Sequence, residues 1–116
     1  MLIVDDHPGF RRSARRMLAA EGFDVIGEAV DGSSVLALVR ALRPQVVLLD
    51  VLLPDTDGFV VAELLADEPL PPCVVLTSSR DASDFASRLE RTPATGFLPK
   101  AELSGTTLAA FAEVAL

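Results

Sequence analysis

Short runs of β-branched and other apolar residues alternate along this chain with longer segments in which apolar residues recur at helical spacing. This alternation is the feature that most constrains the fold, because it is typical of a parallel sheet covered by helices on both faces. The sequence therefore predicts an α/β fold. The expected strands are residues 1–4, 24–29, 45–49, 73–76 and 95–98.

The segments between and after these strands are expected to form helices. Pro8 suits the first turn of the first helix, and Gly22 is expected to end it. The second helix is expected to follow the turn at residues 31–33, Asp81 is a candidate N-cap for the fourth, and the last is expected at residues 101–116. The side chains expected to face the sheet are Phe10, Ala14, Met17 and Leu18; Val35, Leu38, Val39 and Leu42; Val61, Leu64 and Leu65; Ala82, Phe85, Ala86 and Leu89; and Leu108, Phe111, Ala112 and Ala115.

The length of 116 residues suits one compact domain, and 50% of the residues are hydrophobic, which is enough for a core. We therefore expect a single domain over residues 1–116. With 17 acidic and 10 basic side chains the formal net charge is −7, which repels nucleic-acid phosphates and anionic lipids. No apolar run approaches the roughly 18–20 residues that span a bilayer, and the lone Cys73 fits a reducing cytosol and a packing role. The expected location is the cytoplasm, with no membrane and no direct nucleic-acid partner.

Polar side chains follow four of the expected strands. Asp5 and Asp6 come directly after the first strand, Asp50 after the third and Thr77 after the fourth, and Lys100 lies two residues beyond the fifth. In an open parallel sheet the carboxyl ends of the strands share one edge, and ligands bind there. An aspartate after a strand is often only a helix cap, and a lone lysine is usually a solvated charge. The shared edge of these residues favours a functional site instead.

The chemistry of these side chains indicates phosphoryl transfer. Three converging carboxylates would repel one another unless a divalent cation lay between them, and Mg²⁺ suits a site with few carboxylates. His7 is not needed as a ligand in such a site and is expected either at the surface or as a neighbour of the ligating residues. Lys100 supplies a mobile positive charge, and the Thr77 hydroxyl supplies a hydrogen-bond donor. Because an aspartate can be the covalent phosphoryl acceptor, these residues predict a Mg²⁺-dependent aspartyl-phosphate site centred on Asp50.

Four motifs carry a resemblance to a known family. They are LIVDDHPGFR, PQVVLLDVLLPDTDGF, VVLTSS and GFLPK. Their order and spacing, with 27 residues from Asp50 to Thr77 and 23 more to Lys100, resemble those of the receiver domain of bacterial two-component response regulators over essentially the whole chain. The resemblance implies a flavodoxin-like, doubly wound five-stranded parallel sheet in the order 2-1-3-4-5 with helices on both faces.

The resemblance also implies a phosphorelay function. In that family the aspartate that matches Asp50 accepts a phosphoryl group from the phosphohistidine of a sensor histidine kinase, in a Mg²⁺-dependent reaction. The implied Mg²⁺ ligands are Asp6 and Asp50 directly, Asp5 through water, and the backbone carbonyl of Leu52.

The remaining implied roles concern the response to the phosphoryl group. Lys100 would pair with the phosphoryl oxygens, Thr77 would move inward to bond them, and Phe97 would rotate into the space that Thr77 leaves. This switch would remodel a surface for a downstream protein partner, in a monomer or a phosphorylation-linked homodimer. The domain would not be a turnover enzyme, because it promotes only its own phosphorylation and dephosphorylation.

Some alternatives remain open from the sequence. The spacing from Thr77 to Lys100 is one residue longer than expected for the family, so Ser78 is an alternative switch hydroxyl. A degenerate receiver would act as an interaction module without phosphorylation, although the intact set of site residues argues against it. A small Mg²⁺-dependent aspartyl phosphatase would need a general acid two residues after Asp50, where Leu52 stands.

Overall fold

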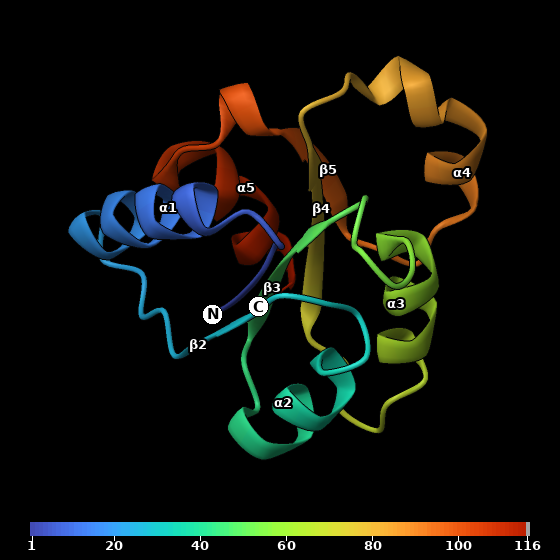
Figure 1. Ribbon diagram of the computed structural model, residues 1–116, viewed down its shortest axis with the longest axis horizontal. Helices are drawn as coiled ribbons and strands as arrows, with labels where there is room; N and C mark the ends of the chain where they lie inside the picture. The colour runs from blue at the N-terminus through green and yellow to red at the C-terminus, as the bar shows by residue number, and fades with distance from the viewer. Residues whose placement is uncertain (116) are drawn as a thin grey trace.

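The computed structural model describes the backbone of residues 1–115 and the side chains of residues 1–111. Five parallel strands lie in the order β2-β1-β3-β4-β5, as predicted (Figure 1). The strand order reverses between β1 and β3, so the crevice at the carboxyl ends of these strands is a topological switch point. The strands are β1 Leu2–Val4, β2 Gly27–Ala29, β3 Val46–Asp50, β4 Cys73–Ser78 and β5 Gly96–Pro99. The helices are α1 Pro8–Ala20, α2 Val35–Leu42, α3 Gly58–Ala66, α4 Ala86–Arg91 and α5 Gly105–Ala115, with the 3₁₀ turns η1 Ala82–Phe85 and η2 Lys100–Glu102 before α4 and α5.

Helices cover both faces of the sheet, and each face has its own apolar cluster (Figure 1). α1 and α5 cover one face, where Leu18 packs with Leu48 of β3. α2, α3 and α4 cover the other face, where Leu65 packs with Leu49. Successive residues of β3 therefore serve opposite faces, as strand geometry requires. Among the residues that the structure describes, no helix has the length and apolar character needed to cross a membrane.

Two strands differ in length from the prediction by two or more residues, because of the way in which they pair with their neighbours. Only Gly27–Ala29 of the predicted strand 24–29 pairs with β1, since β1 itself offers only Leu2–Val4. β4 continues to Ser78, two residues beyond the predicted end, because its ladder with β3 runs on through the pair of Asp50 and Thr77. This extension places Thr77 inside the sheet.

The helical segments also begin differently from the prediction. Asp81 stands at the N-cap of η1 but makes no capping bond through its side chain. Phe85 leaves helical geometry, with φ −124° and ψ 15°, and buries its ring, so that the predicted fourth helix becomes a 3₁₀ turn followed by a short α4. α5 begins at Gly105, four residues later than expected. Its start is capped reciprocally, because Ser104 Oγ accepts from the N–H of Thr107 at 3.0 Å and Thr107 Oγ1 accepts from the N–H of Ser104 at 2.9 Å.

Most side chains that were expected to face the sheet are buried or half-buried, but four are exposed: Leu42, Leu64, Ala82 and Ala86. Leu64 is 52% exposed. The prediction for this residue failed because α3 is apolar on nearly all sides, so the sequence pattern does not show which side of the helix packs against the sheet. Leu42 lies at the end of α2, and the two alanines flank the break at Phe85. Ala112 and Ala115 lie outside the described side chains.

The core of the sheet makes a direct stability prediction. Leu48 is fully buried in the central strand, so Leu48→Ala should lower the free energy of unfolding by about 2–5 kcal/mol through lost burial and a cavity. Leu70→Ala is the matched control, because Leu70 is 79% exposed and its loss should cost less than about 0.5 kcal/mol. Urea titrations of both variants measure the difference, and equal losses would contradict the assignment of the core.

Candidate functional site

The carboxyl ends of four strands bring the predicted site residues together. Asp5 follows β1 directly, Asp50 is the last residue of β3, Thr77 lies near the end of β4, and Lys100 follows β5 directly in η2. Parallel register places Asp50 beside Thr77, and Thr77 beside Leu98 of β5. The edge predicted from the strand ends is therefore present as one site.

The carboxylates of the site differ in exposure. Asp5 is fully buried and Asp50 is 3% exposed, whereas 37% of the Asp6 side chain is exposed. One ligand atom each from Asp5, Asp6, His7 and Asp50 can be chosen so that all lie within 4.8 Å of one another. Carboxylate oxygens at this separation fit a hard divalent cation such as Mg²⁺, with open positions left for water.

Lys100 balances the two buried carboxylates. Its Nζ lies 2.6 Å from Asp5 Oδ2 and 3.3 Å from Asp50 Oδ2, and only 16% of its side chain is exposed. Removing two carboxylates from water is costly unless a positive charge lies between them. The lysine therefore belongs to the site and is not the solvated charge of the alternative interpretation.

The two buried carboxyl groups titrate differently. Burial and the neighbouring charge of Asp5 raise the pKa of Asp50 to about 6, against the opposing effect of Lys100. Burial also works against ionisation of Asp5. Its pKa is nevertheless held below the usual value, because Lys100 binds the carboxylate and the backbone N–H of His7 donates to it at 2.8 Å. Asp5 is therefore the ionised partner of Lys100, and Asp50 is the group whose charge depends on pH near neutrality.

Thr77 and Ser78, the two candidate switch hydroxyls, have different surroundings. Both residues are buried. Ser78 Oγ accepts from the backbone N–H of Arg80 at 3.1 Å, so it serves the turn that follows β4. Thr77 Oγ1 is buried and has no hydrogen-bond partner among the described residues. An orphaned buried hydroxyl beside Asp50 fits an added phosphoryl oxygen as its partner, and this favours Thr77 over Ser78.

The loop after β3 is folded tightly over Asp50. The N–H of Leu52 donates to Asp50 Oδ1 at 3.3 Å, and Leu52 forms an isolated bridge with Asp57. A Cβ added to Gly58 would lie 2.5 Å from the carbonyl oxygen of Asp50, so only glycine fits there. Asp57 caps α3 by accepting from the N–H of Val60 at 3.0 Å. The loop therefore holds Leu52, the expected carbonyl ligand, beside the carboxylate.

Phe97 does not lie at the carboxylate cluster. It packs with the apolar cluster on the α2–α3–α4 face, and its ring centroid is 5.9 Å from that of Phe85, which lies 5.8 Å from that of Phe59. Leu98, the register partner of Thr77, points to the opposite face. Because successive side chains of a strand point to opposite faces of the sheet, the ring of Phe97 lies on the α2–α3–α4 face and Leu98 lies on the α1–α5 face.

Two further residues contact the acidic residues of the site, His7 at their carboxylates and Arg11 at a backbone carbonyl. His7 is 66% exposed, as expected, but its Nδ1 lies 3.0 Å from Asp5 Oδ1 and 3.2 Å from Asp6 Oδ1. Arg11 Nη1 donates to the backbone carbonyl of Asp5 at 2.7 Å. The spacing of Arg11 from Asp5, one helical turn into α1, was the available signal, but charged residues on exposed helix faces are too common for it to be distinctive.

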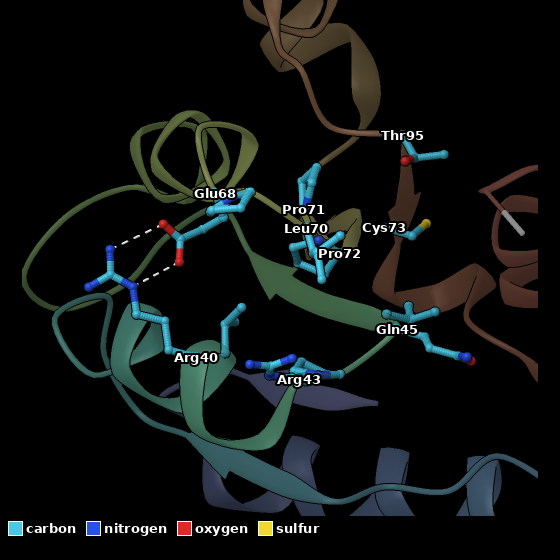
Figure 2. A pocket seen from close by; sticks show the side chains of 13 residues that line it. Arg40, Arg43, Gln45, Glu68, Leu70, Pro71, Pro72, Cys73 and Thr95 are labelled. Carbon is cyan, nitrogen blue, oxygen red and sulfur yellow. Dashed lines mark hydrogen bonds and ion pairs between the residues drawn. The ribbon is translucent and has the colours of Figure 1, made fainter.

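A separate cavity of about 790 Å³ lies at the other edge of the sheet. Its lining includes Gln45, just before β3, and Cys73, the first residue of β4, and Figure 2 shows these two side chains on the opposite side of the pocket from the Arg40–Glu68 ion pair. Cys73 is buried, as its packing role predicted. Because the cavity opens at the amino ends of the strands, it is not part of the carboxylate site.

The raised pKa of Asp50 predicts a pH-dependent effect of its neutralisation. A raised pKa means that the folded state favours the protonated group, so the stability linked to Asp50 is present at low pH and is lost as pH rises through about 6. Without divalent metal, Asp50→Asn should therefore raise the free energy of unfolding by about 1–3 kcal/mol at pH 7.5 and by only about a third of that amount at pH 4.5.

Urea titrations in the presence of a chelator at both pH values measure this effect. Asp84→Asn is the matched control, because Asp84 is exposed and its substitution should give no such pH difference. An equal effect of Asp50→Asn at the two pH values would show that the carboxyl group is not destabilised by its site.

Comparisons with known proteins agree with this geometry. The family model for the response regulator receiver domain matches residues 1–111. The chain is 36% identical over 116 residues to a protein of Pseudomonas aeruginosa that is named as a transcriptional regulator, and 42% identical over 92 residues to the DNA-binding response regulator MtrA of Mycolicibacterium smegmatis. These alignments cover 99% and 78% of this chain.

The chain spans only 56% and 39% of the length of these two relatives. The solved signal receiver domain of the response regulator NarL from Mycobacterium tuberculosis is similar over nearly its full length, with a TM-score of 0.83 and 36% identity over 95% of this chain and 93% of that one. The chain thus belongs to the family of response regulator receiver domains of two-component systems.

Proposed function

We propose that residues 1–116 form one receiver domain that is switched by phosphorylation of Asp50. The proposal rests on the two polar groups that lie beside this carboxylate. Lys100 Nζ lies 3.3 Å from it, and the buried hydroxyl of Thr77, adjacent in the sheet, has no partner among the described residues. A phosphoryl group on Asp50 would offer oxygens to both.

Mg²⁺ is the metal that the site fits. We propose that Asp6 and Asp50 bind it directly, that the backbone carbonyl of Leu52 completes the protein ligands, and that Asp5 contacts it through water. The donor atoms within 4.8 Å and the position of Leu52 against Asp50 support this set. When bound, Mg²⁺ would neutralise charge on the phosphoryl oxygens and so lower the barrier to transfer.

The protein's own residues carry out the remaining steps of phosphoryl transfer. One carboxylate oxygen of Asp50 forms a bond to phosphorus while the bond from phosphorus to the donor atom breaks, and the donor leaves with its electron pair. The attacking group must be ionised, and a pKa of about 6 leaves Asp50 largely ionised at neutral pH. Lys100, already in contact with Asp50, then pairs with the new phosphoryl oxygens, while its contact with Asp5 keeps it near.

We propose that Thr77 and Phe97 couple the phosphorylation of Asp50 to a conformational change at the protein surface. The Thr77 hydroxyl moves to bond the phosphoryl group, and the ring of Phe97 leaves its packing on the α2–α3–α4 face and rotates into the space that Thr77 leaves. Phe97 contacts Phe85, which lies between Phe97 and Phe59, so its rotation would disturb the packing of η1 and α4. The remodelled surface would bind a downstream protein, or a second copy of the chain in a phosphorylation-linked homodimer.

The partners follow from the family. Receiver domains interact with histidine kinases, and the phosphodonor proposed here is the phosphohistidine of a sensor histidine kinase. Relatives such as MtrA are named for DNA binding, but the net charge of −7 argues against nucleic-acid binding by this domain itself. A cytoplasmic location is part of the proposal, and a single, buried cysteine, Cys73, is consistent with it.

We do not propose a turnover enzyme. A phosphatase that uses an aspartyl nucleophile would need a general acid two residues beyond Asp50, and the side chain at that position is the apolar, half-exposed Leu52. Repeated turnover of a small phosphomonoester by the purified domain would contradict this part of the proposal.

Intact-protein mass spectrometry tests the proposed function. Incubation with acetyl phosphate and Mg²⁺ should add one phosphoryl group to the wild-type protein, and the addition should vanish without Mg²⁺ and in Asp50→Asn. Asp55→Asn is the matched control, because Asp55 lies in the same loop but accepts from the backbone N–H groups of Gly32 and Ser33. A mass gain that survives in Asp50→Asn, or no gain in the wild type, would overturn the proposal and favour an interaction module that works without phosphorylation.

A further inference from the structure

The ammonium group of Lys100 has an aromatic neighbour. Lys100 is the single lysine of the sequence, and its Nζ lies 4.4 Å from the centroid of the Phe10 ring, over the ring. The same Nζ contacts Asp5 and Asp50. A cation over an aromatic face within about 6 Å is attracted by the ring's electron density, most strongly where little water competes.

The position of Phe10 is fixed by the start of α1. The helix begins at Pro8, and Phe10 in its first turn packs partly buried against the cluster on the α1–α5 face. The next residue, Arg11, donates to the carbonyl of Asp5 at 2.7 Å and pairs with Glu28 at 3.2 Å. These contacts tie the first turn of α1 to β1 and β2, so the ring is a rigid support for the flexible lysine side chain.

We infer that Phe10 is a positioning residue for Lys100, holding its ammonium group at the carboxylate edge where the phosphoryl oxygens arrive. The inference rests on the proposed phosphorylation of Asp50. A lysine side chain has many rotamers, and a group that is already in place avoids the cost of being ordered in the transition state. Lys100 gives up no proton in this role, because it contributes its charge while the phosphoryl group passes to Asp50 and the donor leaves.

Two substitutions at Phe10 separate its aromatic face from its apolar volume. Phe10→Leu keeps an apolar side chain but removes the face, so phosphorylation by acetyl phosphate should slow by about 3- to 10-fold. Phe10→Tyr keeps the face and should stay within about twofold of the wild type. Phe23→Leu is the matched control, because Phe23 packs partly buried against the same cluster and does not belong to the carboxylate edge; its rate should be unchanged.

A double-mutant cycle tests whether Phe10 acts through Lys100. In a Lys100→Ala background, Phe10→Leu should cause no further slowing, because the group that it positions is absent. An equal slowing with and without Lys100 would show a general structural role and overturn the inference.

An NMR measurement tests the contact without relying on phosphorylation. Because the chain has one lysine, a sample labelled with ¹³C-lysine gives one set of side-chain signals, those of Lys100. Its Hε protons should show an upfield ring-current shift that is lost in Phe10→Leu and kept in Phe10→Tyr. The same shift in wild type and Phe10→Leu would overturn the inference.

Different results would contradict the proposed phosphorylation of Asp50 and the proposed role of Phe10. If acetyl phosphate does not modify wild-type Asp50, the proposed function fails, and the NMR result still decides whether Phe10 holds the ammonium group. If the wild type is modified and Phe10→Leu reacts as fast as wild type and Phe23→Leu, the proposed function stands and the positioning role is wrong.

Discussion

The site depends on one electrostatic constraint, which is that two carboxylates are buried side by side with one ammonium group between them. Asp5 is fully buried and Asp50 nearly so, and Lys100 contacts both, at 2.6 Å and 3.3 Å. Burial raises the pKa of Asp50 to about 6, and the charge of Asp5 adds to this effect, because the single charge of Lys100 does not neutralise two carboxylates. The edge therefore favours a divalent cation, whose positive charge would also offset the negative charge of a phosphoryl group on Asp50.

The surrounding fold holds this arrangement in place. The parallel ladder sets Asp50 beside Thr77, and the loop after β3 returns so closely that a side chain at Gly58 would collide with the backbone of Asp50. On the other side, Arg11 ties α1 to the carbonyl of Asp5. Sheet, loop and helix therefore each fix one part of the site. Among the described residues, Thr77 Oγ1 is a buried hydroxyl next to Asp50 that has no hydrogen-bond partner.

The local patterns of the sequence predicted the α/β class and the carboxylate edge, because apolar runs of strand length recur along the chain and polar residues follow four of them. The strand order was implied by the family resemblance. The sequence was less reliable where a pattern was ambiguous. α3 is apolar on nearly all sides, so Leu64 was wrongly placed inward, and the ring of Phe85 interrupts a segment that reads as one helix. The distinction between Thr77 and Ser78, and the contact of Phe10 with Lys100, depend on the positions of single atoms, which no spacing rule contains.

A crystal structure of the protein with Mg²⁺ and beryllium trifluoride, which mimics a phosphoryl group on a carboxylate, tests the central claim most directly. The account predicts an adduct on Asp50, with Lys100 Nζ and Thr77 Oγ1 both within hydrogen-bond distance of its fluorine atoms and Mg²⁺ against Asp6. An adduct on another carboxylate, or a Thr77 hydroxyl that remains without a partner beside an occupied Asp50, would contradict it.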